Sequence, residues 1–268
     1  MLEHPTLDKL ASLRLVGMLA ALSEQIANPE YAKLSFEERL GLLVDREVIH
    51  RQNRQMALRM KRAMLRQDAS IEDIDFRQPR GLDRSVVLSL SSCQWLKNRR
   101  NCLITGPTGV GKTFLACALA QKACREGYSA RYVRVGRLLG ELASARLEGL
   151  YFERLRALSG IDLLVLDDWG VTPLSDESRR DLLEILEDRY DRRSTLVTSQ
   201  LPVQKWHEYL ADPTIAEAIL DRLVHNAHKI AMTGDSMRRM KAAVGEAEAD
   251  PSKRHVTVTE EVGDASAA

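Results

Sequence analysis

Residues 106–113 read Gly-Pro-Thr-Gly-Val-Gly-Lys-Thr and match the phosphate-binding pattern GxxxxGK[ST] in full. An apolar run at 102–105 precedes this loop, and a helical pattern at about 112–126, closed by Gly127, follows it. A strand, a glycine-rich turn and a helix N-terminus form the arrangement that cradles a phosphate group. The loop therefore favours an α/β fold in which strands and helices alternate.

Each part of this loop has a chemical role. Gly106, Gly109 and Gly111 let the backbone turn tightly, so that successive N–H groups point inward. Lys112 is expected to reach the β- and γ-phosphates as a catalytic residue, and the Thr113 hydroxyl to ligate Mg²⁺. The expected cofactors are ATP and Mg²⁺, with nucleotide contacts from Gly106, Pro107, Thr108, Gly109, Val110, Gly111, Lys112, Thr113 and Phe114.

A second apolar run, residues 161–166, leads into the acids Asp167 and Asp168. Because a parallel strand ends at the crevice where ligands bind, acids at that edge face the phosphates. We expect Asp167 to hold Mg²⁺, directly or through water, and Asp168 to act as general base or positioner for the attacking water. The alternative is a solvated acid pair that caps the next turn, and the upstream loop favours the catalytic interpretation.

Polar residues also end the apolar run that begins at residue 195. As a further central strand, this run would bring Thr198, Ser199 or Gln200 near the γ-phosphate as a polar sensor. An ordinary polar strand end would have the same sequence. Thr198 and Gln200 are the predicted nucleotide contacts.

Two arginines are candidates for charge stabilisation. Arg222 lies late on a helix that Asp212, as N-cap, and Pro213, at the first helical position, should begin. It is a candidate arginine finger that stabilises the γ-phosphate in a neighbouring subunit, or else a surface ion-pair partner. Arg238, just past the last predicted strand, is a candidate phosphate-sensing arginine or part of a basic turn.

The N-terminal part of the chain carries a candidate DNA-binding surface. Ser35 followed by Glu38 forms a capping-box pattern ahead of a helical apolar stripe. Six basic residues and no acidic one follow between residues 48 and 67, and on a helix they span an arc of roughly 160°. Such a face could contact DNA phosphates, meet an acidic protein partner, or simply be solvated. The six residues are Arg51, Arg54, Arg59, Lys61, Arg62 and Arg66.

Composition sets the remaining limits. The net charge of +1 over 268 residues means that any nucleic-acid surface must come from local clustering. No apolar run approaches the roughly 20 residues of a membrane helix, and no signal sequence is evident, so a cytoplasmic protein is expected. The four cysteines form no CxxC pair and are expected to be reduced structural thiols.

The chain divides into four regions by composition. We predict an N-terminal helical domain at 1–67, a linker at 68–81, a nucleotide-binding domain at 82–245 and a disordered tail at 246–268. Five parallel strands are expected in the nucleotide-binding domain, and too few residues follow the last of them for a full helical lid. The strands are expected at 102–105, 130–135, 163–167, 195–198 and 229–232.

With these motifs in place, the chain resembles the IstB-like ATP-binding proteins, transposition helpers that are related to DnaC-type helicase loaders. This resemblance implies a AAA+ fold, ATP-dependent oligomerisation on duplex DNA, and delivery of that DNA to an IstA-like transposase. It also supports Arg222 as the finger and Arg238 as the second sensor. The segments that carry it are 69–77, 106–123, 163–170, 181–190, 194–208, 212–230 and 234–239.

Two positions depart from the family pattern. Most AAA+ proteins have Glu where this chain has Asp168, which is one methylene shorter, so slow or partner-stimulated hydrolysis is expected. The polar sensor of many relatives is Asn, whereas this chain has Gln200. The expected function is an ATPase regulator of DNA transposition. The alternatives are a DnaC-like replicative helicase loader, a P-loop kinase and a nucleotide-switched DNA scaffold with negligible turnover.

Overall fold

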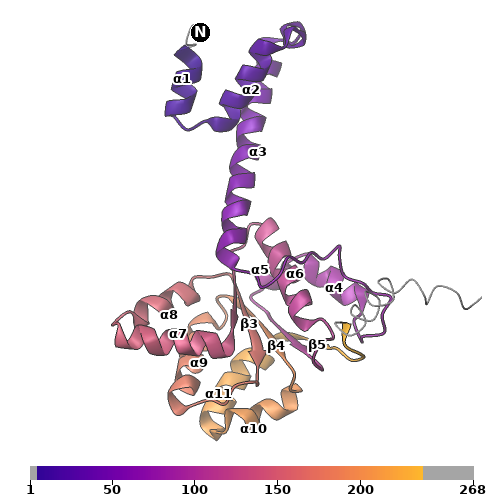
Figure 1. The fold of residues 1–268 in the computed structure, drawn as a ribbon, viewed down its shortest axis with the longest axis vertical. Coiled ribbons are helices and arrows are strands. Elements are labelled where there is room, and N and C mark those ends of the chain that lie inside the picture. The colour runs from indigo at the N-terminus through magenta and orange to yellow at the C-terminus, as the bar shows by residue number, and fades with distance from the viewer. Residues whose placement is uncertain (1–4, 238–268) are drawn as a thin grey trace, which may run out of the picture.

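Five short strands form one parallel sheet in the computed structural model, which describes residues 5–237. Their order across the sheet is β2-β3-β4-β1-β5, so β1 lies between β4 and β5. Figure 1 shows the sheet, with β3, β4 and β5 labelled, flanked by helices. The predicted five-stranded parallel sheet is confirmed, with small differences at strand ends. The strands are β1 (Asn101–Thr105), β2 (Ala130–Arg134), β3 (Leu163–Trp169), β4 (Ser194–Ser199) and β5 (Ala227–Ala231).

Helices cover both faces of the sheet because successive strand residues point to opposite sides. Leu163 and Val165 of β3 face one apolar cluster, whereas Leu164 and Leu166 face the other. The central strands are therefore buried on both faces and read as nearly continuous apolar runs.

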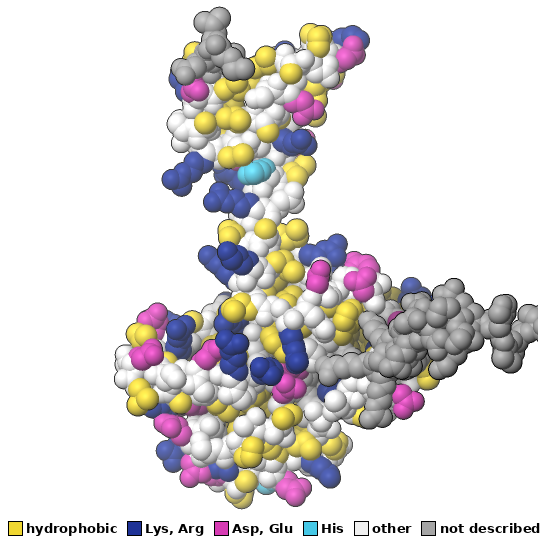
Figure 2. Space-filling model, in the orientation of Figure 1, with side chains coloured by type: hydrophobic (Ala, Val, Ile, Leu, Met, Phe, Trp, Pro, Cys, Tyr) yellow, Lys and Arg dark blue, Asp and Glu magenta, His cyan; other side chains and the backbone are white. Residues whose placement is uncertain are grey.

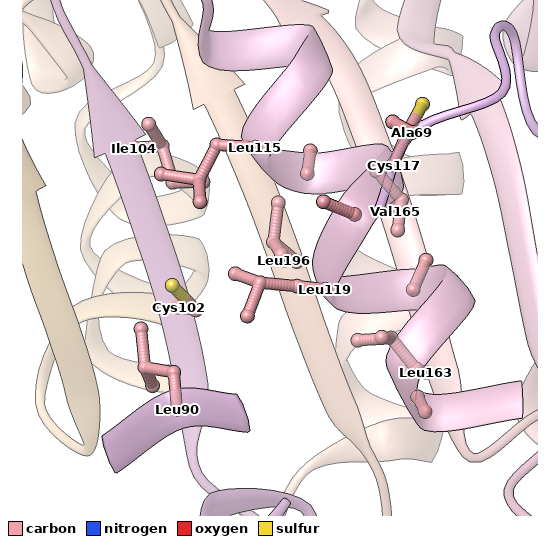
Figure 3. Packing of buried hydrophobic residues seen from close by; sticks show 14 of the residues in the cluster. Ala69, Leu90, Cys102, Ile104, Leu115, Cys117, Leu119, Leu163, Val165 and Leu196 are labelled. Carbon is pink, nitrogen blue, oxygen red and sulfur yellow. The ribbon is translucent and has the colours of Figure 1, made fainter. Parts of the chain in front are cut away.

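One face of the sheet packs against α6 (Lys112–Arg125), the helix that follows the phosphate-binding loop. Leu115, Cys117 and Leu119 of α6 lie against side chains from β1, β3 and β4 (Figure 3). The helices α4 (Arg84–Ser91) and α5 (Gln94–Lys97) contribute to the same cluster. The P-loop helix is therefore fixed to the sheet along its length.

The opposite face is covered by the helices between β2 and β5. The α11 start confirms the predicted cap, since the Asp212 side chain accepts a hydrogen bond from the Ile215 N–H at 2.9 Å and Pro213 occupies the first turn. These elements are α7 (Val135–Leu147), α8 (Tyr151–Ser159), α9 (Asp176–Arg189), η2 (Val203–Lys205), α10 (Trp206–Leu210) and α11 (Pro213–Val224).

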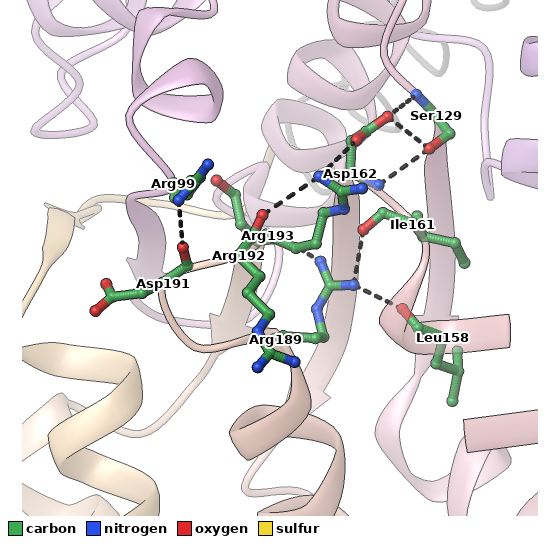
Figure 4. A network of polar contacts seen from close by, with 10 residues as sticks. Arg99, Ser129, Leu158, Ile161, Asp162, Arg189, Asp191, Arg192 and Arg193 are labelled. Carbon is green, nitrogen blue, oxygen red and sulfur yellow. Dashed lines mark hydrogen bonds and ion pairs between the residues drawn. The ribbon is translucent and has the colours of Figure 1, made fainter. Parts of the chain in front are cut away.

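A buried arginine network fastens the N-terminal ends of the central strands (Figure 4). Arg189 is 1% exposed and donates to the Thr195 hydroxyl and to the carbonyls of Leu158, Ile161 and Ser194. Burial lowers the pKa of Arg189 to about 9. This guanidinium thus ties α8, β3 and β4 to the end of α9, at the sheet edge where β3 and β4 begin.

The N-terminal helices form a hairpin that stands away from the sheet (Figure 1). They are α1 (Pro5–Ser12), α2 (Val16–Ala27), the 3-10 turn η1 (Pro29–Lys33) and α3 (Phe36–Ala63). The predicted capping box is present at the start of α3, where Ser35 and Glu38 exchange side-chain and backbone hydrogen bonds. The α2 and α3 helices pack so closely that a Cβ at Gly17 would lie 2.6 Å from the Arg46 carbonyl oxygen.

The other end of α3 is anchored to the nucleotide-binding body. Arg59 Nε donates to the carbonyl of Cys124, in the last turn of α6, at 2.9 Å. The helix then ends at Ala63, because Met64 adopts a left-handed conformation with φ 49°. The predicted helix extends through Arg66, whereas the structure places Arg66 in the irregular segment beyond α3.

The segment at 68–81, predicted to be a linker, is irregular but packed. Ala69, Ile71 and Ile74 are buried in the cluster around α6. The predicted tail at 246–268 lies outside the described residues.

The four cysteines, predicted to be reduced structural thiols, are free and buried in the structure. Burial raises the pKa of the Cys102 thiol to about 12. Among residues 5–237, no three His, Cys, Asp or Glu side chains form a group that could hold a metal ion. No helix in the same part of the chain combines the length and apolarity needed to cross a membrane.

Candidate active site

The phosphate-binding loop joins the end of β1 to the start of α6. Gly106, Gly109 and Gly111 have φ values of 147°, 91° and 103°, a region that other residues rarely adopt. A Cβ at Gly109 would overlap the Ser236 side chain, and one at Gly106 would overlap the carbonyl of Met232. The loop therefore needs glycine for two reasons: its backbone turns through positive φ, and the segment after β5 lies too close to leave room for a side chain.

Lys112 opens α6 with its ammonium group directed into this loop. The side chain is largely buried and donates to the carbonyl oxygens of Gly106 and Pro107, at 2.7 Å each. A lysine amine donor thus lies beside a glycine loop at a helix N-terminus, which is the arrangement that binds a polyphosphate.

Asp167 collects three hydroxyl groups at the end of β3. Thr113 Oγ1 lies 3.1 Å from both of its carboxylate oxygens, and the hydroxyls of Tyr132 and Thr198 also donate to it. Asp167 is 1% exposed. Carboxylate and hydroxyl oxygens are the ligands that Mg²⁺ takes in nucleotide sites, so this donor set fits Mg²⁺ held by Thr113 and Asp167.

Asp168 is turned away from the regular strand path. Its φ is 60°, and the pairing of β3 with β4 shifts register between Leu166 and Trp169. The side chain is 37% exposed, in contrast to Asp167. A non-glycine residue at positive φ is uncommon, and here it gives two adjacent acids different surroundings.

Arg66 is the residue at this site that sequence reasoning assigned elsewhere. Its Nη1 lies 3.6 Å from Asp167 Oδ2 and 4.0 Å from Asp168 Oδ2. Hydrogen bonding with Tyr132, together with the charges of Asp167 and Asp168, raises the pKa of this guanidinium, which stays charged. No sequence pattern could predict the contact, because it depends on the left-handed turn at Met64.

Two further segments flank the loop, and only the one after β5 was expected there, through Arg238. Arg80 Nη1 donates to the carbonyl of Val110 at 3.1 Å, and the Arg80 carbonyl accepts from the Thr233 N–H at 2.9 Å. The Met237 N–H donates to the carbonyl of Gly109 at 3.0 Å. The chain that follows β5 thus borders the nucleotide site directly. The predicted sensor Arg238 lies just outside the described residues.

The three polar residues at the end of β4 make different contacts. Thr198 is buried and bonded to Asp167, so it supports the acid directly. The Ser199 hydroxyl donates to the Trp169 carbonyl at 2.7 Å. Gln200 follows as an exposed residue beyond the strand.

Arg222 lies at the opposite end of the sheet from the P-loop. Its carbonyl accepts from Asn101 Nδ2 at 2.8 Å, and Asn101 begins the strand that the loop ends. The guanidinium contacts Glu187 and donates to the Ala218 carbonyl at 2.8 Å. Arg222 cannot reach the nucleotide site of its own subunit, so a role in that chemistry would require a neighbouring copy.

Some of the candidate DNA-binding residues on α3 are bonded to other parts of the protein, and others are exposed. Arg51 pairs with Glu47 at 2.7 Å, and Arg59 is used to fasten α3 to α6. Arg54, Lys61 and Arg62 are exposed. Lys and Arg side chains gather along α3 and where it meets the sheet domain (Figure 2).

A family model and individual relatives of known sequence agree on one family for this chain. A family model described as IstB-like ATP binding protein matches residues 8–244. The chain is 54% identical, over 239 residues, to a putative insertion sequence ATP-binding protein of Sinorhizobium fredii, covering 89% of this chain and 98% of that protein. It is 33% identical, over 232 residues, to the insertion sequence IS21 putative ATP-binding protein of Pseudomonas aeruginosa, covering 87% and 86% of the two chains.

Solved structures share the nucleotide-binding fold. The crystal structure of DnaI has a TM-score of 0.54 and 25% identity, over 63% of this chain and 92% of that one. AMPPCP-bound DnaA from Aquifex aeolicus has a TM-score of 0.53 and 18% identity, over 69% and 56%. The sheet order and flanking helices described above are thus those of a AAA+ protein.

Proposed function

Because the chain belongs to the IstB-like ATP binding protein family, we propose that it is an ATP-dependent regulator of DNA transposition that acts in the cytoplasm. It oligomerises on duplex DNA and delivers that DNA to an IstA-like transposase. Hydrolysis of ATP at subunit interfaces resets the assembly.

One observation carries the nucleotide chemistry. Thr113 from α6, Thr198 from β4 and Tyr132 from β2 converge on the buried Asp167 carboxylate, beside the glycine loop. Three separate elements are thus folded around one acid at the sheet edge where parallel strands bind ligands. Bound Mg²⁺ would neutralise charge on the β- and γ-phosphate oxygens at this point.

The chain's own groups divide the reaction between them. Lys112 transfers its hydrogen bonds from the loop carbonyls to phosphate oxygens when nucleotide enters. Asp168, half-exposed next to Asp167, orients a water molecule and accepts its proton. The Asp168 side chain is short, so turnover is slow until DNA or a partner improves the alignment. Gln200 and Arg238 sense the γ-phosphate from the strand end and from the segment after β5.

A neighbouring subunit completes the site. Arg222 is too far from its own P-loop to contact bound nucleotide, and its planar, permanently charged group suits a developing γ-phosphate charge. The Glu187 contact holds the side chain at the surface of the separate subunit. Assembly exchanges this contact for the partner's nucleotide, which makes hydrolysis depend on oligomerisation.

DNA is held through its phosphates. Arg54, Lys61 and Arg62 are exposed on α3 and can contact phosphates directly. Arg51 contributes less positive charge, because it pairs with the Glu47 carboxylate. Aromatic side chains suited to base stacking are absent among residues 48–67, so little sequence readout is expected from this segment.

A DnaC-like helicase loader is the alternative function, because the DnaC helicase loader shares the nucleotide-binding fold. Both functions use the same ATPase residues. They differ in the partner of the N-terminal hairpin, so the discriminating measurement is binding to a transposase against binding to a replicative helicase.

The first experiment measures nucleotide and duplex binding by the full chain, with wild type and Lys112→Ala in parallel. Wild type should bind a fluorescent ATP analogue in magnesium buffer and shift duplex DNA into large complexes, while Lys112→Ala should lose at least about tenfold in nucleotide affinity, or roughly 1.4 kcal/mol. Absence of nucleotide binding in wild type would reject the proposal. If this protein stimulates strand transfer by the cognate transposase and does not load a replicative helicase, the transposition function is supported. The reverse result would support the helicase loader.

A further inference from the structure

A pocket of about 260 Å³ opens beside the edge strand β2, between the segment that follows α3 and the first turns of α7. Four of its lining side chains are arginines, namely Arg66, Arg131, Arg134 and Arg137, and we call it the arginine pocket. Glu141 is the single carboxylate in the lining, and it pairs with Arg137 at 2.9 Å. The lining thus carries four positive charges and one negative charge, and Arg66 also pairs with Asp167 and Asp168 next to the pocket.

Two of these guanidinium groups are available to an anion. Arg134 is exposed and forms no ion pair with any residue between 5 and 237. Arg131 donates to the carbonyl of Arg62 at 3.4 Å and, within the same residues, pairs with no carboxylate. A guanidinium presents paired N–H donors that match the oxygens of a phosphate group.

We propose that the arginine pocket binds phosphate groups of the DNA backbone, and that Arg66 couples this binding to the nucleotide site. The inference rests on the DNA binding proposed above and names a second set of contacts for it. The pocket continues the basic surface of α3, because Arg131 contacts the backbone of Arg62. Figure 2 shows blue side chains both along α3 and at its base.

The dimensions suit a duplex. Arg51 and Arg62 are separated by about 16 Å along the α3 axis at roughly 1.5 Å per residue. A DNA strand covers that length in about five phosphates at roughly 3.4 Å each. A backbone that follows the exposed side chains of α3 therefore arrives at the pocket. An acidic protein segment would match the charge, but the continuous basic track from α3 favours DNA.

Arg66 stands at the boundary between the two sites. It lines the arginine pocket and, at the same time, approaches Asp167 and Asp168 at 3.6 and 4.0 Å. Tyr132 shares this position, since it lines the pocket and donates to Asp167. A cation bound to Asp167 would weaken the attraction for Arg66, whose guanidinium would then turn to a phosphate in the pocket. Each ligand thereby strengthens the binding of the other.

The first test measures affinity for a labelled duplex by fluorescence anisotropy across a salt titration, with a non-hydrolysable ATP analogue and Mg²⁺ present. The double variant Arg134→Ala/Arg137→Ala should bind more weakly, and its slope of log affinity against log salt should be shallower by about 1.8, because each lost phosphate contact contributes about 0.9. The variant Arg134→Lys/Arg137→Lys keeps the charges and should retain the wild-type slope.

The matched control is Arg154→Ala/Arg156→Ala on α8. Both residues are exposed and outside the pocket, so the control removes the same charge without touching the proposed contacts. Its salt slope should equal that of wild type. Circular dichroism melts of all variants verify that the fold is retained.

The second test uses Arg66→Ala and measures binding alone. In wild type, Mg²⁺ with the analogue should raise DNA affinity, and DNA should raise nucleotide affinity by the same factor. In Arg66→Ala this factor should fall to about one. Without DNA, the variant should bind Mg²⁺ and the analogue at least as tightly as wild type, because a competitor for Asp167 is gone.

The outcomes separate this inference from the proposed function. If wild type binds no duplex DNA, the proposed function itself fails. If wild type binds DNA and the pocket variant shows an unchanged affinity and salt slope, only the arginine pocket is rejected. Unchanged DNA binding with loss of self-assembly would assign the pocket to a second copy of this chain and would also overturn the inference.

Discussion

The Thr113 hydroxyl lies 3.1 Å from each carboxylate oxygen of Asp167, although 54 residues separate the two in sequence. This contact joins the first turn of α6 to the end of β3, and it brings together the two side chains that the P-loop pattern and the acidic strand end separately predict as metal ligands.

Asp167→Asn removes the negative charge and nearly preserves the volume of the side chain. We expect Mg²⁺-dependent affinity for ATP to fall by about tenfold or more, roughly 1.4 kcal/mol, while affinity in EDTA stays close to wild type. Titration with a fluorescent ATP analogue, with and without Mg²⁺, measures both. Asp45→Asn, on an exposed position of α3, is the matched control. An undiminished magnesium response in Asp167→Asn would exclude this residue as a ligand.

Asp168→Asn should abolish turnover while sparing ATP binding. A lost general base typically reduces a rate by about 10²–10⁴-fold, and the amide cannot accept the proton of the attacking water. Phosphate release measures the rate, and the analogue titration measures binding. Wild-type hydrolysis in this variant would remove Asp168 from the mechanism.

Arg222→Ala should bind ATP normally and hydrolyse it roughly 10³-fold more slowly, because the finger acts in a neighbouring subunit. Mixing it with Lys112→Ala tests this arrangement directly. The first variant keeps an intact P-loop and the second an intact finger, so the mixture should regain turnover that neither has alone. A mixture as inactive as its components would argue against action between subunits.

Gly17→Ala and Gly41→Ala form a matched pair in the N-terminal hairpin. A Cβ at Gly17 would lie 2.6 Å from backbone atoms of α3, whereas one at Gly41 meets nothing within 4 Å. We expect the first change to cost about 1–3 kcal/mol in the free energy of unfolding by overpacking, and the second to gain about 0.5–1 kcal/mol from helix propensity. Urea denaturation followed by circular dichroism measures both. Equal effects at the two sites would contradict the packing described.

Cys102 should make stability depend on alkaline pH. Burial raises the pKa of its thiol from 9.0 to about 12, so the folded protein keeps a proton that the unfolded chain loses above pH 9. Its contribution to the free energy of unfolding is therefore full below pH 9 and falls between pH 9 and 12, by up to about 1.4 kcal/mol per pH unit. Urea denaturation at pH 8 and 10 should show a smaller loss in Cys102→Ala than in wild type. An equal loss would mean that this thiol does not titrate as described.

Local patterns were enough to predict the sheet and several helix ends. The glycine loop, the apolar runs and the capping residues Ser35 and Asp212 act over a few residues, where the physics depends mainly on neighbours in sequence. The five strands and both caps are confirmed. The P-loop and the acidic strand end also sit together because parallel strands finish at a common edge.

Long-range contacts could not be predicted in the same way. A helix pattern at 48–67 suggested one basic face, but a single left-handed residue, Met64, ends α3 and sends Arg66 to the acids. Tyr132 and Arg80 carry no motif, and their roles arise only when β2 and the segment at 68–81 pack beside the loop. Sequence periodicity describes which face is apolar but not what that face will touch.

The α3 helix is attached to the last turn of the P-loop helix α6 through Arg59, and most of its length projects beyond that contact. From Arg59 to Phe36 it extends about 35 Å at roughly 1.5 Å per residue. A tilt of α3 by about 10° at the Arg59 contact would move the tip of the hairpin by about 6 Å. A small displacement of α6 at the nucleotide would thus become, at the far end, a movement comparable to one turn of a helix.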